Sequence, residues 1–104
     1  MLGLGKWKFR IDTMFYRGDA FLTICDVDGA YDIKIDVPGQ AVPKVVFDNM
    51  QQEGDTLTGA AITDLFKGKA IPFSMTFSGD QANGFLKIPM FGKLKLNNGV
   101  KLAD

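Results

Sequence analysis

The chain has 104 residues, of which 46% are apolar and 23% are charged, a balance typical of one globular domain and not of a disordered chain. Its 12 lysines and arginines match its 12 aspartates and glutamates, and neither sign forms a long run. The basic footprint of a nucleic-acid-binding protein is therefore not predicted. The sequence contains no histidine, the commonest general base and transition-metal ligand, so we expect a non-enzymatic protein with no metal and no cofactor.

The single cysteine and the first residues of the sequence indicate the cellular compartment that we expect. Cys25 has no partner for an internal disulfide, and we expect it to be a small buried residue. The apolar stretch at the first residues is too short for a signal peptide, and no segment has the length needed to cross a bilayer. A cytoplasmic protein is the expectation.

Alternation of apolar and polar residues predicts strands throughout the chain. In the first segment Trp7, Phe9 and Ile11 face one way, and the charged residues between them face the other. The predicted strands are 6–12, 20–27, 31–37, 44–52, 56–63, 71–78, 85–88 and 93–96, with 100–102 as a candidate continuation of the last strand. No amphipathic helical stretch of any length interrupts them.

Two kinds of turn alternate between these strands. One kind is short and polar, and comprises Asp28-Gly29, Glu53-Gly54-Asp55, Asp80 to Gly84 and Asn97-Asn98-Gly99. The other carries bulky apolar residues at Met14-Phe15-Tyr16, Val42, Leu65-Phe66 and Met90-Phe91. If every intervening segment is a strand, successive turns lie at opposite ends of the sheet, so the polar turns gather at one end and the apolar turns at the other.

Short connections decide the fold class. Most connections have only two to six residues, too few to cross a sheet, so we predict an all-β protein. Its eight strands form an antiparallel up-and-down meander, which closes into a small barrel or forms a strongly curled sheet. A two-sheet sandwich with Greek-key crossings is the main alternative.

A resemblance to a known group begins at the first strand. Gly5-Lys6-Trp7 resembles the G-x-W signature of the calycin superfamily, the lipocalin and fatty-acid-binding-protein group. Residues 53–59 and 89–92 resemble segments of small bacterial lipocalin-like domains of about a hundred residues. The resemblance implies a single lipocalin-like β-barrel domain over residues 1–104, a tryptophan that closes one barrel end, and a ligand-binding role. The arginine that packs across this tryptophan in larger lipocalins has only Lys95 and Lys101 as candidates here.

The interior of such a barrel is either filled by side chains or holds one small molecule. The predicted inward set is Trp7, Phe9, Ile11, Tyr31, Ile33, Ile35, Phe47, Phe73, Met75 and Phe77. Gly59, Ala60 and Ala61 leave space on the fifth strand, which either receives the Trp7 indole or contributes to a ligand cavity.

The apolar turns are the strongest functional lead, because solvated loop tips normally carry glycine, asparagine, aspartate and serine. We expect a non-enzymatic binding module for a small hydrophobic ligand at this rim. Its binding residues are expected to be Trp7, Phe15, Tyr16, Leu65, Phe66, Phe73, Met75, Phe77, Met90 and Phe91. One alternative is a rim that folds inward as a plug. The other is a protein-interaction or self-associating structural domain, in which the same rim buries against a different protein or against a second copy in a homodimer.

Overall fold

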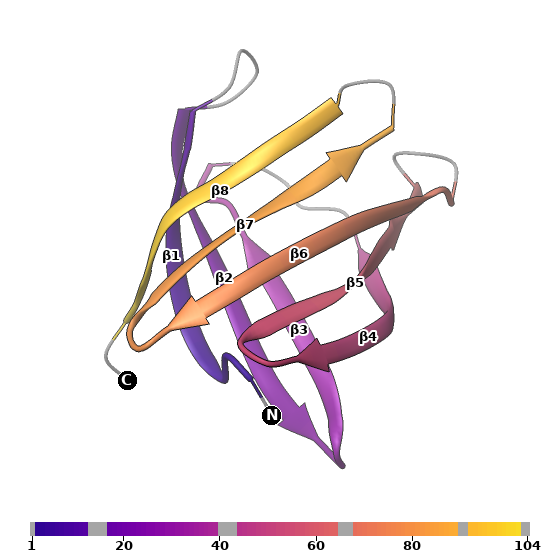
Figure 1. Cartoon of the computed structure of the whole chain (residues 1–104). Coiled ribbons are helices and arrows are strands. Elements are labelled where there is room, and N and C mark those ends of the chain that lie inside the picture. Colours follow the sequence, from indigo (N-terminus) through magenta and orange to yellow (C-terminus); the bar gives the residue numbers. More distant parts are fainter. Residues whose placement is uncertain (1, 13–16, 40–43, 65–67, 90–91, 103–104) are drawn as a thin grey trace.

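Eight antiparallel strands follow one another in a single curled sheet (Figure 1). The computed structural model describes residues 2–12, 17–39, 44–64, 68–89 and 92–102. The strands are β1 (Gly5–Asp12), β2 (Arg17–Val27), β3 (Ala30–Asp36), β4 (Val45–Glu53), β5 (Thr56–Thr63), β6 (Ala70–Ser78), β7 (Gln81–Ile88) and β8 (Gly92–Lys101). The described residues include no helix long and apolar enough to span a bilayer.

The sheet curls into a nearly closed barrel. Its strand order is β3-β2-β1-β8-β7-β6-β5-β4, so β1 pairs with β8 and the two edge strands are β3 and β4. Every pair of sequence neighbours except β3 and β4 is hydrogen-bonded antiparallel. The predicted meander is confirmed, and the alternative of two sheets joined by Greek-key crossings is wrong.

Tight polar turns close one end of the barrel, which we call the polar end. Asp28 and Gly29 form a two-residue hairpin with φ values of 53° and 84°, and the Gly29 N–H donates to Asp26 Oδ1 at 2.9 Å. Positive φ at both positions is what this hairpin turn requires, which explains the Asp-Gly sequence. The opposite end, where β1, β3, β5 and β7 finish, is the rim end. The predicted apolar turn residues 14–16, 42, 65–66 and 90–91 fall outside the described residues.

Two predicted polar turns are partly or wholly wrong. Residues 81–84 belong to β7, so the turn is limited to Gly79 and Asp80. Residues 97–99 belong to β8, where the register shifts on both neighbouring strands. Asn98 takes the left-handed conformation with φ of 57°, and the Phe9 ring packs where a side chain at Gly99 would lie. A bulge and a turn need the same residue types, so the local sequence did not distinguish them.

The best-packed part of the core lies at the polar end. Trp7 of β1 and Phe77 of β6 pack across the interior with ring centroids 5.0 Å apart, and Trp7 is 1% exposed. The Trp7 Nε1–H donates to the Gly3 carbonyl oxygen at 2.8 Å, so the buried indole is fully satisfied. The Phe77 ring lies directly against Gly3. The N-terminal residues therefore help to cover this end of the barrel.

All ten residues of the predicted inward set are buried or half-buried. Trp7, Phe9, Ile33, Phe73, Met75 and Phe77 are buried, and Ile11, Tyr31, Ile35 and Phe47 are half-buried. The prediction missed Ile24, Leu57 and Ala82, which belong to the same core cluster. Cys25 is half-buried and not buried as expected. Successive side chains of a strand point to opposite faces, and Ile24 faces inward, so Cys25 faces outward.

The space at Gly59 is not filled by the Trp7 indole. The atoms nearest to a side chain placed there belong to Met50, Asp48 and Phe73. Met50 reaches this position because β4 carries a bulge, with Asn49 at φ 53° and a register shift between Asp48 and Gln51. The bulge bends β4 and turns its second half across the polar end (Figure 1).

A chain of hydrogen bonds links β3 and β4 where no ladder joins them. The Leu2 N–H donates to Tyr31 Oη at 2.9 Å, and the Tyr31 hydroxyl donates to Gln52 Oε1 at 3.2 Å. Tyr31 lies at the start of β3 and Gln52 at the end of β4, so this link is at the polar end. One hydroxyl thus joins the two sheet edges to the N-terminal segment.

We predict that Phe77→Ala lowers the free energy of unfolding by about 3–5 kcal/mol, because it removes the ring that covers Trp7 and leaves a cavity. Urea unfolding followed by far-UV circular dichroism and by Trp7 fluorescence measures the change. Val100→Ala, at an exposed position on β8, is the control and should change stability by less than about 0.5 kcal/mol. Equal effects of the two substitutions would contradict the assignment of the core.

We predict that Tyr31→Phe lowers the free energy of unfolding by about 0.5–1.5 kcal/mol, because the ring stays and only the hydroxyl link is lost. Hydrogen exchange should become faster at amides of β3 and β4 and stay unchanged in β7. Thr56→Val is the control, since the Thr56 hydroxyl meets Thr76 across strands that a ladder already joins. Unchanged exchange at β3 and β4 in Tyr31→Phe would contradict the link.

Candidate functional site

The barrel interior contains a cavity of about 120 Å³. Side chains from every strand except β4 line it, and all of them are apolar. The lining residues are Phe9, Ile11, Ala20, Phe21, Leu22, Ile24, Ile33, Ile35, Val37, Leu57, Phe73, Met75, Leu86, Leu94 and Leu96. With no polar partner for water in its wall, a cavity of this kind favours apolar contents.

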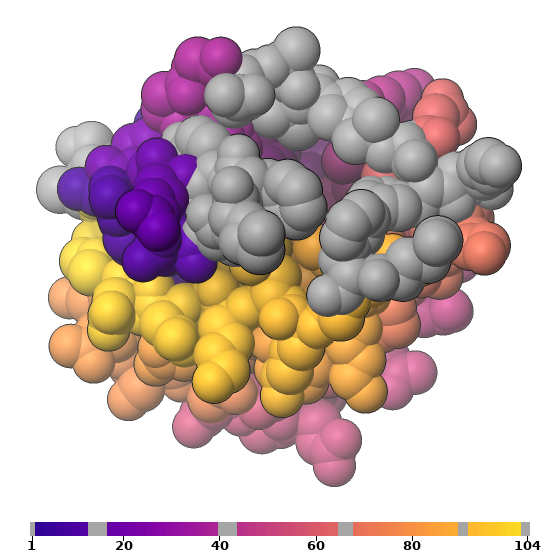
Figure 2. Space-filling model, turned by 90° about the horizontal axis from the view of Figure 1, so that it is seen from above, coloured from indigo at the N-terminus to yellow at the C-terminus, as the bar shows by residue number. Residues whose placement is uncertain are grey.

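Exposure of the lining side chains changes along the barrel axis. Toward the polar end Phe9, Ile24 and Leu57 are 1–2% exposed. Toward the rim end Ile11 and Ile35 are inward-facing but only half-buried, as is Val37 just beyond β3. Figure 2 looks onto this end of the barrel, with β8 in yellow across the lower half of the view. The cavity is therefore sealed toward the polar end and extends toward the rim end.

The structure brings only part of the predicted site together. Phe73 and Met75 line the cavity from β6, as expected for inward residues. Trp7 and Phe77 pack against each other at the polar end and are not among the lining residues. The six remaining predicted residues, Phe15, Tyr16, Leu65, Phe66, Met90 and Phe91, lie outside the described residues.

Strand β2 contributes lining residues that the prediction missed. Ala20, Leu22 and Ile24 face the cavity, while Phe21 lines it in part from the intervening position. The segment is apolar on both faces, so alternation did not reveal which side faces inward. The pairing of Leu22 with Trp7 on β1 would have supplied that information, because directly opposed residues share a face of the sheet.

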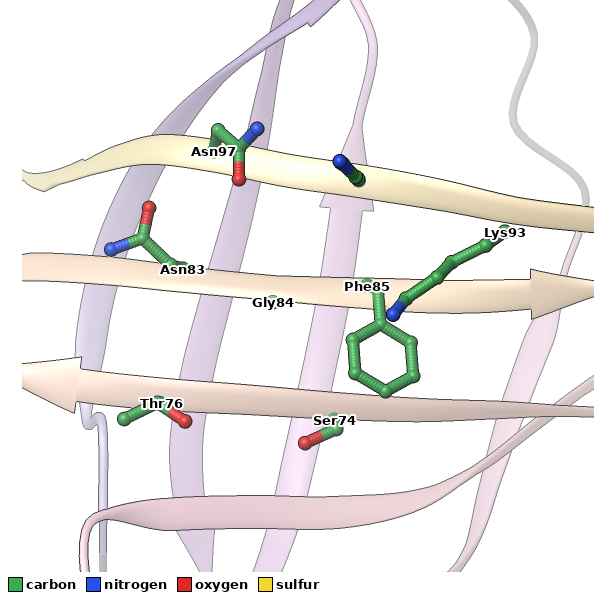
Figure 3. Close-up of a pocket in the computed structure, with 8 residues that line it drawn as sticks. Ser74, Thr76, Asn83, Gly84, Phe85, Lys93 and Asn97 are labelled. Carbon is green, nitrogen blue, oxygen red and sulfur yellow. The ribbon is translucent and has the colours of Figure 1, made fainter.

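A second hollow lies on the outside of the barrel, across β6, β7 and β8. This outer groove has a volume of about 360 Å³ and is lined by Ser74, Thr76, Asn83, Gly84, Phe85, Lys93, Lys95 and Asn97. Figure 3 shows side chains of all three strands on one surface of the sheet. This surface was not predicted from the sequence, because its residue types are those of an ordinary solvated strand face.

The outer groove combines an aromatic ring with cations and amides. Lys93 Nζ lies 4.0 Å from the centre of the Phe85 ring, within cation–π distance (Figure 3). Phe85 is the register partner of both Ser74 and Lys95. The Asn98 N–H donates to Asn83 Oδ1 at 3.1 Å, which fixes one end of the Asn83 amide.

Gly84 holds β6 and β7 close together beneath the outer groove. A side chain at Gly84 would overlap the Ser74 carbonyl oxygen and lie 2.9 Å from Met75 Cα. The register shift between Ala82 and Gly84 marks the same place in the β7–β8 pairing. Gly84 therefore contributes only backbone to the outer groove.

Charge is segregated between the strands although the chain is neutral. Strand β6 contains no charged residue, and the charged residues of β7 and β8 are all lysines, namely Lys87, Lys93, Lys95 and Lys101. The charged residues of β2, β3 and β4 are mostly carboxylates, namely Asp19, Asp26, Asp32, Asp36, Asp48 and Glu53. On β1, Lys8 and Arg10 both lie 3.8 Å from Asp19. The outer surface of the barrel therefore has a basic side and an acidic side.

Within the described ranges, no group of three histidine, cysteine, aspartate or glutamate side chains is placed to hold a metal ion. Comparison of the chain with protein-family models, with curated proteins and with solved structures finds no match.

We predict that Gly84→Ala lowers the free energy of unfolding by about 1–3 kcal/mol, because backbone atoms of β6 must move to admit the new methyl group. Urea unfolding measures the change. Gly59→Ala is the matched control, since the atom nearest to its methyl group is the mobile Met50 sulfur at 2.6 Å. A loss at Gly59 as large as the loss at Gly84 would contradict a rigid approach of β7 to β6.

Proposed function

We propose that this protein is a non-enzymatic binding module that holds one small hydrophobic molecule inside its barrel. The observation that carries the proposal is the cavity whose wall is wholly apolar and which extends toward the rim end. An apolar wall stabilises a ligand through burial of its surface, at about 25 cal/mol per Å² removed from water. No polar side chain of the wall would fix a polar group deep inside.

Cavity size limits the ligand. A dry engineered cavity of about 150 Å³ takes up benzene, whereas sites for drug-sized ligands span about 300–1,000 Å³. The volume of about 120 Å³ therefore suits a single small ring or the end of an acyl chain. A larger ligand would extend beyond the cavity at the rim end.

The lipocalin-like resemblance supports the same proposal. Trp7 stands at the start of the first strand and covers one end of the barrel, as the G-x-W signature implies. Lys101 is the register partner of Trp7, and its side chain lies over Gly5, so Lys101 is better placed than Lys95 to replace the missing arginine. Lys95 lies in the outer groove.

We predict that benzene binds in a saturable manner and shifts the methyl NMR signals of Ile24, Ile33 and Leu57, because these side chains line the cavity. Ile35→Phe should weaken binding at least about tenfold, since the added ring occupies the rim-side half of the cavity. Val46→Phe places the same ring on an outward position that is 53% exposed, and binding should be unchanged.

Two results would overturn this proposal. The first is the absence of saturable methyl shifts at benzene concentrations near its solubility. The second is a stable homodimer, detected by light scattering, that excludes benzene and the dye ANS. This second result would favour the interaction or structural domain expected as the alternative.

A further inference from the structure

We propose that the outer groove across β6, β7 and β8 is a second, independent site that binds a small polyhydroxylated anion, meaning a sugar that carries a carboxylate or a phosphate. The site is on the opposite surface of the sheet from the cavity, and its residues alternate with the cavity-lining residues along the same strands. It therefore does not depend on the hydrophobic ligand.

Lys93 and Lys95 in the outer groove, with Lys87 beside it, favour an anionic ligand. Lys87 and Lys93 are register partners on β7 and β8, and like charges placed directly opposite each other repel. Lys95 lies two residues further along the same face of β8. In the described part of the chain, none of these three lysines forms an ion pair with a carboxylate. A bound anion would relieve the repulsion and supply the missing counter-charge.

The Phe85 ring favours a ligand with an apolar face. Its side chain is half-buried on the outer surface, where an aromatic ring otherwise has no packing partner in the core. The ring face carries partial negative charge, which attracts the partly positive C–H groups on one face of a sugar. Lys93 already lies over this ring, so an anion that draws the ammonium group aside would expose the ring to the sugar.

Hydroxyl and amide groups surround the ring and the lysines. Ser74 on β6 provides a hydroxyl and Asn97 on β8 provides an amide, and each can donate and accept. The Thr76 hydroxyl meets Thr56 at 3.0 Å and can form one further hydrogen bond to a ligand. Asn83 accepts from Asn98 through Oδ1, and its NH₂ group has no partner among the described residues. Such mixed donors and acceptors match the hydroxyls of a sugar ring.

The extent of the outer groove argues against a nucleic-acid strand. Proteins that bind single strands use several aromatic platforms along a basic track, whereas this groove has one ring. The basic side also ends at β1, where Lys8 and Arg10 are paired with Asp19. The cations thus define a local site and not a track.

The test is a titration of the ¹⁵N-labelled protein in which the NMR shifts of the backbone amides are measured after each addition of the probe. The probes are galacturonate as the sugar carboxylate, glucose 6-phosphate as the sugar phosphate, glucose as the neutral sugar, and sulfate as an anion without a sugar. We expect saturable shifts at Gly84, Phe85 and Lys95 with at least one of the two anionic sugars. Which of them binds more tightly identifies the acidic group. Glucose and sulfate should each bind at least about tenfold more weakly.

Variants assign the contacts. Lys95→Gln and Phe85→Leu should each weaken binding of the anionic sugar by about tenfold, through loss of a charged hydrogen bond and of the ring face respectively. Lys34→Gln makes the same charge change on exposed β3 and should leave binding unchanged. The proposal is overturned if neither anionic sugar gives saturable shifts, if sulfate or glucose binds as tightly, or if Lys34→Gln weakens binding as much as Lys95→Gln. We expect the three substitutions and the sugar ligands to leave benzene binding inside the barrel unchanged, so the two proposed sites are tested separately.

Discussion

Contacts across the interior keep the sheet curled, because the ladder of hydrogen bonds is interrupted between β3 and β4. Trp7 and Phe77 connect β1 with β6, which are separated in the sheet by β8 and β7. Phe47 on the edge strand β4 meets Phe73 edge-on at 5.8 Å between ring centroids. These aromatic contacts and the Tyr31 hydroxyl replace the missing ladder. The contact of Trp7 with Phe77 and the Tyr31 hydroxyl lie at the polar end, whereas Phe47 and Phe73 meet nearer the rim end, where Phe73 also lines the cavity.

The period of two along a strand makes β6, β7 and β8 a wall with two unlike surfaces. Phe73, Met75 and Leu86 face the cavity, while Ser74 and Phe85 face the outer groove. A slip of one residue in the pairing would exchange these surfaces and place polar side chains in the core. Gly84 and the bulge at 97–99 fix the register of this wall at two places.

Local alternation was sufficient to predict the strands and the meander, since the period of two and the Asp28-Gly29 turn are encoded within a few residues. It was insufficient wherever long-range pairing decides the result. Residues 97–99 have the composition of a turn, yet pairing with β1 and β7 makes them a bulge within β8. Likewise, the small residue Gly59 indicated space, but only the bulge in β4 determines that Met50 fills it.

The distribution of charge was also not predictable from composition. Composition gives only the net charge of the chain, whereas the fold determines where the charged side chains lie on the surface. Most of the carboxylates precede β6 in the sequence, β6 has no charged residue, and the charged residues of β7 and β8 are all lysines. In a meander, a continuous stretch of sequence becomes a continuous part of the barrel wall, so this separation along the chain becomes a separation in space. A neutral total is therefore compatible with a locally basic surface. Phe85 and the surrounding amide and hydroxyl groups distinguish the outer groove from an ordinary solvated face of lysines.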